Sequence, residues 1–189
     1  MKILLVNGSP RNNGNTIRLM NLVAEATKEK HPEADITTFH LNDMDFKGCQ
    51  GCLECKKDNA TGCVVQDDLT ATLDAMMDAK AVIVGFPVYM GHVTGQYKSF
   101  WDRLYGFIGP EGTNRLPGGK KAVVAVTQGV KEPDHYQEMI DLVEGSLGRR
   151  GLEVQTVVAG GTKGLAVGDI RFEPSAEAKA RELGQWLTQ

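Results

Sequence analysis

Short apolar runs alternate with longer amphipathic segments along this chain. The apolar runs predict five β-strands, at residues 2–6, 34–41, 81–84, 122–127 and 152–159. Apolar residues at helical spacing predict five helices between and after them, at about residues 16–30, 69–77, 97–108, 137–147 and 175–187. The unbroken runs at 81–84 and 122–127 are typical of parallel strands that are covered on both faces.

Strands that alternate with helices predict a doubly wound α/β fold with one five-stranded parallel sheet in the order 2-1-3-4-5. In this order the sheet reverses direction between its first and third strands, so the loops after these strands flank one crevice where ligands bind. The 189 residues suit a single domain, which carries a long insertion at about 42–66. We expect Asp67 or Asp68 to cap the second helix, and Asp134 with Gln137 to cap the fourth.

Composition and charge narrow the class of protein. The chain is 41% hydrophobic and 24% charged, and its net charge of −3 comes from interspersed charges, which argues against nucleic acid or an anionic membrane as partner. The first apolar run is too short for a signal peptide, and the apolar stretch at 79–93 is too short to span a bilayer. The sequence therefore predicts a soluble, cytoplasmic protein. Its four cysteines all lie between positions 49 and 63, unlike a disulfide framework.

The first strand is followed by GSPRNNGNT, residues 8–16, which combines glycines, hydroxyls, amides and one cation at the start of a helix. Backbone N–H groups at a helix N-terminus lack internal partners and favour an anion. Neither the nucleoside-triphosphate loop nor the dinucleotide fingerprint is present, so the pattern favours a single phosphate monoester. The alternative is a polar turn, capped by Asn15, that binds no ligand.

The third strand is followed by PVYMGHVTGQYKSFWDR, residues 87–103. Tyr89 is placed to stack on a ring, and glycines let backbone N–H groups face a flat ligand such as a flavin. Thr127, Gln128 and Gly129 follow the fourth strand and are candidates for a third wall. We interpret His92 as a polar loop residue and not as a catalyst. The alternative is that residues 87–103 only form a tight strand-to-helix connection, in which Tyr89 has no ligand-binding role.

The cysteines form the second chemical signal. Cys49, Cys52 and Cys55 stand at C-x2-C-x2-C spacing, and Cys63 follows eight positions later. Three closely spaced thiolates can hold three corners of a [4Fe-4S] cluster, with the fourth thiolate from the same loop. Zinc would favour two separated C-x2-C pairs, which are absent. Free thiols in an insertion ordered by subunit contacts are the alternative.

Together with CQGCLEC and a closing GDIRF, these two loops resemble the NADPH-dependent FMN reductase and iron–sulfur flavoprotein family of flavodoxin-like proteins, over nearly the whole chain. The resemblance implies FMN as cofactor, with phosphate contacts from Ser9, Arg11, Asn13, Asn15 and Thr16. It also implies that the isoalloxazine ring is bordered by Pro87, Val88, Tyr89, Met90 and Gly91, to which we add Thr127 and Gly129. Family members are commonly homodimers or homotetramers, which makes Trp101, Tyr105 and Phe107 candidates for a subunit surface.

Our main hypothesis is an FMN-dependent NAD(P)H oxidoreductase that passes electrons to free flavin, a quinone or the cysteine-held cluster. It needs no catalytic side chain, because the cofactor carries the chemistry. The alternative is an iron–sulfur flavoprotein that carries electrons between protein partners without NAD(P)H, although such carriers tend to be strongly acidic. A third possibility is a redox or metal sensor with a structural flavin.

Overall fold

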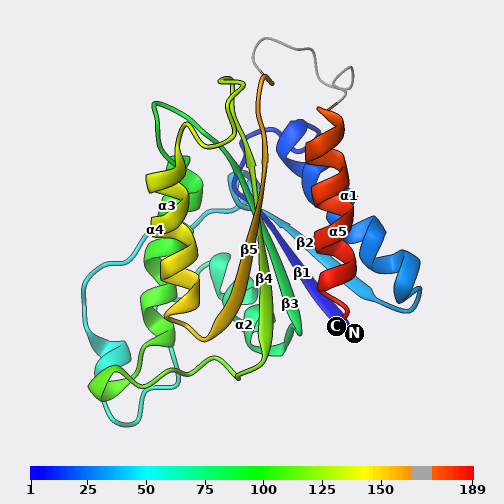
Figure 1. Ribbon diagram of the computed structural model, residues 1–189. Helices are drawn as coiled ribbons and strands as arrows, with labels where there is room; N and C mark the ends of the chain where they lie inside the picture. The colour runs from blue at the N-terminus through cyan, green and yellow to red at the C-terminus, as the bar shows by residue number, and fades with distance from the viewer. Residues whose placement is uncertain (163–171) are drawn as a thin grey trace.

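The computed structural model describes residues 1–162 and 172–189 and contains the predicted five-stranded parallel sheet, ordered β2-β1-β3-β4-β5 (Figure 1). The strands are β1 Lys2–Asn7, β2 Asp35–His40, β3 Ala81–Pro87, β4 Lys120–Thr127 and β5 Leu152–Ala159. The helices are α1 Asn15–Lys30, α2 Leu69–Asp78, α3 Gly95–Arg103, α4 Gln137–Gly148 and α5 Pro174–Trp186. All neighbouring strands pair in parallel, so the predicted fold class and strand order are confirmed.

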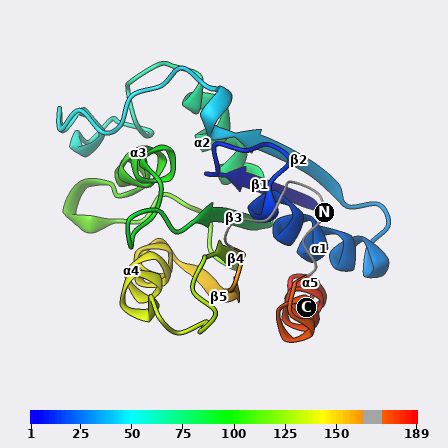
Figure 2. The ribbon, with the colours of Figure 1, turned by 90° about the horizontal axis from the view of Figure 1, so that it is seen from above.

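Helices cover both faces of the sheet (Figure 2). Ile3 and Leu5 of β1 point to the face covered by α1 and α5, while Leu4 and Val6 point to the face covered by α2, α3 and α4. Both sets are almost completely buried, as expected for a central parallel strand. Because the strands are packed on both faces, the positions of their carboxyl ends are fixed. The loops after β1, β3 and β4 meet at this edge of the sheet.

Two details of the helices differ from the sequence prediction. The predicted Asp134–Gln137 capping pair is wrong: Tyr136 is the N-cap of α4, and the Gln137 side chain donates to Asp141 within the helix. The third predicted helix is shorter than expected, because the chain tightens after Arg103 into the 3₁₀ turn η3, Leu104–Phe107. At α2, Asp68 is the N-cap, but Asp67 supplies the side-chain acceptor for the Leu69 N–H.

The candidate subunit-surface aromatics lie in different environments. Phe107 is buried in the core of this chain, so its assignment to a subunit surface is wrong. Trp101 is half-buried and donates its ring N–H to Ser146, whereas Tyr105 is 40% exposed. Of the closing motif GDIRF, residues 168–171 lie outside the described residues, and Phe172 packs on the face covered by α1 and α5.

The insertion at 42–66 begins within the 3₁₀ turn η1, Leu41–Asp43, and contains the turn η2, Glu54–Lys56. In Figure 1 it runs to the lower left, to the turn that follows α3. Cationic side chains fasten it there. Arg103 donates to the carbonyls of Lys47 and Val65 at 2.9 Å each, and Arg115 donates to the Cys55 carbonyl at 2.9 Å.

Arg103 also pairs with Asp67 at 2.7 Å, and its side chain is completely buried. Burial disfavours the charged form of Asp67, but the bonds from Arg103 and from the backbone N–H groups of Lys47 and Leu69 outweigh burial and hold the pKa of this carboxyl below its ordinary value. The pair therefore locks the end of the insertion to the end of α3.

None of the helices in the described part of the chain has the length and apolar character that a bilayer-spanning helix needs.

Candidate functional site

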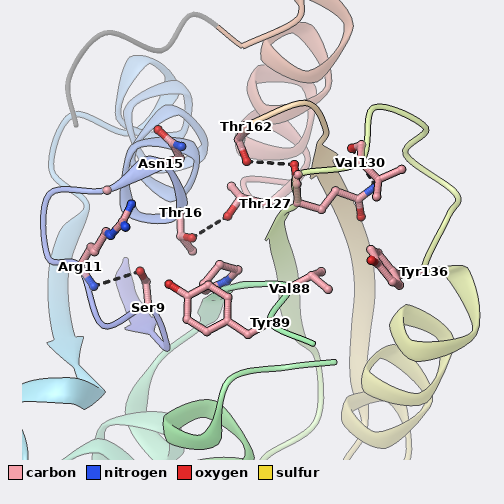
Figure 3. A pocket seen from close by; sticks show the side chains of 14 residues that line it. Ser9, Arg11, Asn15, Thr16, Val88, Tyr89, Thr127, Val130, Tyr136 and Thr162 are labelled. Atoms are coloured by element: carbon pink, nitrogen blue, oxygen red, sulfur yellow. Dashed lines mark hydrogen bonds between the residues drawn. The ribbon is translucent and has the colours of Figure 1, made fainter. Parts of the chain in front are cut away.

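A pocket of about 450 Å³ opens at the carboxyl edge of the sheet, between the loops after β1, β3 and β4 (Figure 3). It lies at the switch point where ligands bind in doubly wound folds. The residues that line it are Ser9, Arg11, Gly14, Asn15, Thr16, Pro87, Val88, Tyr89, Thr127, Gln128, Gly129, Val130, Tyr136 and Thr162.

Backbone contacts hold the first loop to its neighbours. The Gly8 N–H donates to the Gly85 carbonyl at 2.7 Å, and the Gly8 carbonyl accepts from the Thr94 hydroxyl at 2.6 Å. A Cβ at position 8 would lie 2.8 Å from the Cβ of Tyr97, so only glycine fits this approach. Thr94 is also the N-cap of α3 and accepts from the Tyr97 N–H at 3.2 Å. One threonine therefore joins the loop to α3.

The same loop presents donors to the pocket. Gly14, which has no side chain, is the N-cap of α1, so the first N–H groups of this helix face the pocket end of the loop without a side chain above them. The Ser9 hydroxyl accepts from the Arg11 N–H at 3.1 Å, and the Thr16 hydroxyl lies 2.8 Å from the Thr127 hydroxyl. Arg11 is exposed, so its guanidinium is free to meet an anion. The set suits a phosphate monoester.

The loop after β3 forms the second wall. Val88 donates its N–H to the Thr127 carbonyl at 2.8 Å, and Tyr89 pairs with His92 through two backbone bonds. Met90 and Gly91, between them, have φ values of 50° and 76°, the signature of a two-residue type I′ turn. Met90 is fully exposed at the tip, while Tyr89 reaches into the pocket below Thr127 (Figure 3).

The third wall follows β4, and the sequence prediction found only part of it. Gln128 is held at its backbone by Ala159 and Thr162, and its side-chain N–H group donates to the Glu132 carbonyl at 2.6 Å. Val130 and Tyr136 also line the pocket, on the side opposite Arg11 and Ser9 in Figure 3. Tyr136 reads in sequence as part of a helix stripe, and nothing in the local pattern of Val130 or Thr162 marks a site. The pairing of β4 with β5 up to Thr127 and Ala159 brings the segments that carry Val130 and Thr162 together.

The structure brings most of the predicted flavin-site residues to this one pocket. All of them line it except Asn13, Met90 and Gly91. Asn13 is exposed, and Met90 and Gly91 form the exposed turn described above. His92 does not line the pocket.

The pocket residues fit FMN in chemistry and size. The donors at one end are a helix N-terminus, two hydroxyls and one guanidinium, which match a dianionic phosphate. The other end lies between apolar and aromatic side chains, which match a flat ring. In addition, the side-chain oxygens of Asn15 and Gln128 are buried without a hydrogen-bond partner among the described residues. A polar ligand would relieve such a deficit.

The cysteines lie elsewhere, at the other end of α3. Cys49 and Cys52 are exposed, Cys55 is buried and Cys63 is half-buried, and all four line one small cavity beside Arg103. Within residues 1–162 and 172–189, however, no three histidine, cysteine or acidic side chains lie close enough together to hold a metal ion. In this arrangement the thiols do not fit a cluster.

Comparisons with known proteins agree with this geometry. The model of the family described as NADPH-dependent FMN reductase matches residues 1–162. An iron–sulfur flavoprotein of Archaeoglobus fulgidus is 36% identical over 83% of this chain and 74% of its own length. An iron–sulfur flavoprotein of Methanocaldococcus jannaschii is 33% identical over 100% of this chain and 96% of its own. The solved NAD(P)H:quinone oxidoreductase from Methanothermobacter marburgensis superposes with a TM-score of 0.70 at 20% identity, covering 100% of this chain and 98% of that one.

Proposed function

Because the chain belongs to the family of NADPH-dependent FMN reductases, we propose that the pocket at the carboxyl edge of its sheet is the FMN site. As a member of this family the protein is an enzyme, an FMN-dependent NAD(P)H oxidoreductase. One observation carries the proposal: a single pocket joins the N-terminus of α1, where an anion is favoured, to walls that suit a flat ring.

The roles of the residues follow from their places in the pocket. Ser9, Arg11, Asn15 and Thr16 hold the phosphate, because they surround the start of α1. Pro87, Val88 and Tyr89 border the ring on one side. Thr127, Gln128, Gly129, Val130 and Tyr136 border it from the β4 side, and Asn13, Met90 and Gly91 stay predictions from the sequence.

No side-chain acid or base is assigned a catalytic role. When bound, FMN supplies hydride acceptance at its N5 atom. The protein's task is to hold the phosphate, orient the ring and leave one ring face open to a nicotinamide. Met90, beside Tyr89, is fully exposed, so the nicotinamide can approach the ring from the side of this turn.

We further propose a free flavin or a quinone as electron acceptor. The name of the similar Methanothermobacter marburgensis protein, a quinone oxidoreductase, supports a quinone. Anaerobic mixing with NADPH, and separately with NADH, tests the reductase: bleaching of bound FMN without a mediator is expected. FMN that stays oxidised with both nucleotides would favour the carrier function.

The phosphate site is tested by Arg11→Ala. Removing one charge-assisted hydrogen bond should weaken FMN binding by about 1.5–3 kcal/mol, while riboflavin, which has no phosphate, should bind as before. Fluorescence titration of both flavins measures this. Lys28→Ala, at the far end of α1, is the matched control and should change neither affinity. Equal weakening of FMN and riboflavin would show that Arg11 does not contact the phosphate.

The second candidate function is an electron carrier that works between protein partners, without NAD(P)H, and holds one [4Fe-4S] cluster in the insertion. Holding the cluster requires the four thiols to move closer together than they lie in this structure. Two observations favour it: all four thiols line one cavity, and the two similar proteins above are named iron–sulfur flavoproteins. Anaerobic reconstitution with iron and sulfide should then give nearly stoichiometric cluster, which Cys52→Ser should abolish. Four titratable thiols and no iron after reconstitution would leave the reductase without a cluster.

The remaining sequence predictions become proposals of the same kind. We propose that residues 1–189 act as one domain, in the cytoplasm, and as a homodimer or homotetramer. Tyr105 and Leu142 are among the exposed apolar side chains that a subunit contact would cover. Light scattering of the purified protein measures the assembly, and a monomer at micromolar concentration would refute it.

A further inference from the structure

The residue that precedes the phosphate loop is a completely buried asparagine. Asn7 ends β1, and its side-chain oxygen accepts from the Ser9 N–H at 3.1 Å. Its side-chain nitrogen lies 3.0 Å from Nδ1 of His40, the last residue of β2. The parallel register pairs Asn7 with His40 directly, so the sheet itself sets this contact.

The direction of each bond follows from the donors available. A backbone N–H can only donate, so the Asn7 atom that faces Ser9 must be the oxygen Oδ1. The other atom is then the NH₂ group, which can only donate, and Nδ1 of His40 must accept from it. His40 therefore carries its proton on Nε2. In this form the ring satisfies an amide that is buried away from water.

The contact continues into the pocket. The Ser9 hydroxyl accepts from the Arg11 N–H at 3.1 Å, and both residues line the pocket, whereas His40 does not. A second link comes from the same part of the chain, because Asn12 of the loop donates to the carboxylate of Asp43. His40 at the end of β2 and Asp43 in the turn η1 thus hold the loop at two asparagines, one before it and one within it.

We propose that His40 is a positioning residue of the phosphate site, acting through Asn7 on Ser9 and Arg11. Without an acceptor at His40, the Asn7 amide keeps a buried, unsatisfied NH₂ group and gains by rotating away from Ser9. The Ser9 N–H then loses its partner, and the loop loses the conformation that presents its donors. This inference rests on the proposed function, since it assigns His40 a role in binding the phosphate of FMN.

The test compares His40→Leu, which removes the acceptor, with His40→Gln, whose side-chain oxygen can accept from Asn7. FMN should bind about tenfold more weakly to the leucine variant, the effect of about one lost buried hydrogen bond, and riboflavin should bind as before. The glutamine variant should recover most of the FMN affinity. The phosphorus NMR signal of bound FMN should move in the leucine variant only. His31→Leu, at an exposed histidine after α1, is the matched control.

Three results would overturn the assignment: unchanged FMN affinity in His40→Leu, equal weakening of FMN and riboflavin, or no recovery in His40→Gln. A fourth measurement needs no variant, and it applies if the leucine variant does not fold. Nitrogen NMR of the unsubstituted protein should show His40 protonated at Nε2, and a proton on Nδ1 would refute the proposal. If the unsubstituted protein binds FMN no more tightly than riboflavin, the phosphate site itself is wrong, whatever the variants do.

Discussion

The phosphate loop, residues 8–16, and the cysteine insertion, residues 42–66, are both polar stretches with several glycines, yet the protein holds them in different ways. Neighbouring strand ends, the turn η1 and the start of α3 hold the loop through short contacts, from the Gly85 carbonyl and from the side chains of Asn7, Asp43, Thr94 and Thr127. Cationic side chains hold the insertion: Arg103 and Arg115 reach it from distant positions, and Lys56 reaches out of it to the Tyr105 carbonyl. The loop is thus a product of the fold, whereas the insertion depends on particular long side chains.

Helix α3 lies between the phosphate loop and the insertion and contacts one of them at each of its ends. Thr94 at its start contacts the phosphate loop, and Arg103 at its end contacts the insertion. Nine residues of helix place these two anchors about 13 Å apart along the axis. We therefore expect that each anchor can be damaged without loss of the other region.

The largest effect is expected from Arg103→Met, which breaks the anchor of the insertion. The variant leaves Asp67, whose side chain is only 13% exposed, without its partner, so the free energy of unfolding should fall by about 3–5 kcal/mol. Urea unfolding measures this loss. FMN affinity at low temperature, where the variant is folded, should remain unchanged.

Lys98→Met is the control for that experiment, since Lys98 forms an exposed ion pair with Asp102 on the same helix. It should cost less than about 1 kcal/mol. Equal losses in the two variants would mean that Arg103 is no special anchor, and a loss of FMN affinity in Arg103→Met would mean that the regions are coupled.

A smaller effect is expected from Thr94→Val, which breaks the anchor of the loop. The change removes the cap of α3 and the donor to the Gly8 carbonyl, so it should cost about 1–3 kcal/mol of stability. FMN binding should weaken as well, unlike in Arg103→Met. Thr94→Ser keeps the hydroxyl and should retain most of both properties. A valine variant with normal FMN affinity would contradict the role of Thr94 at the loop.

The smallest effect is expected on the pH dependence of stability. Protonation of Asp67 removes its charge but leaves its side chain in place, so less is lost than in a substitution. The folded pKa of this carboxyl lies below its ordinary value of 3.8, so its charge stabilises the protein fully above that pH. This contribution should be lost as the pH falls through the lower, folded pKa. The stability difference between the unsubstituted protein and Asp67→Asn should therefore be constant near neutral pH and shrink in acid. A difference that stays constant into strong acid would be evidence against the charged pair.

The sequence predicts more of the flavin pocket than of the contacts that hold the insertion, and the reason is physical. Strands, helices and strand order follow from local periodicity and from chirality rules, so the pocket position and most residues from the β1 and β3 loops were predictable. Val130, Tyr136 and Thr162 were not, because their place depends on how the loops after β4 and β5 pair. The buried Arg103–Asp67 pair joins residues 36 positions apart, and no spacing rule indicates it.

The separation of the flavin site from the cysteines is the central claim, and one variant tests it most directly. Cys49 and Cys52, which are exposed, are replaced by serine, and the more buried Cys55 and Cys63 by alanine. After reconstitution with FMN, the variant is mixed anaerobically with NADPH. We predict unchanged FMN affinity and complete bleaching of the flavin. A folded variant that has lost FMN, or that holds FMN which NADPH no longer bleaches, would contradict the claim.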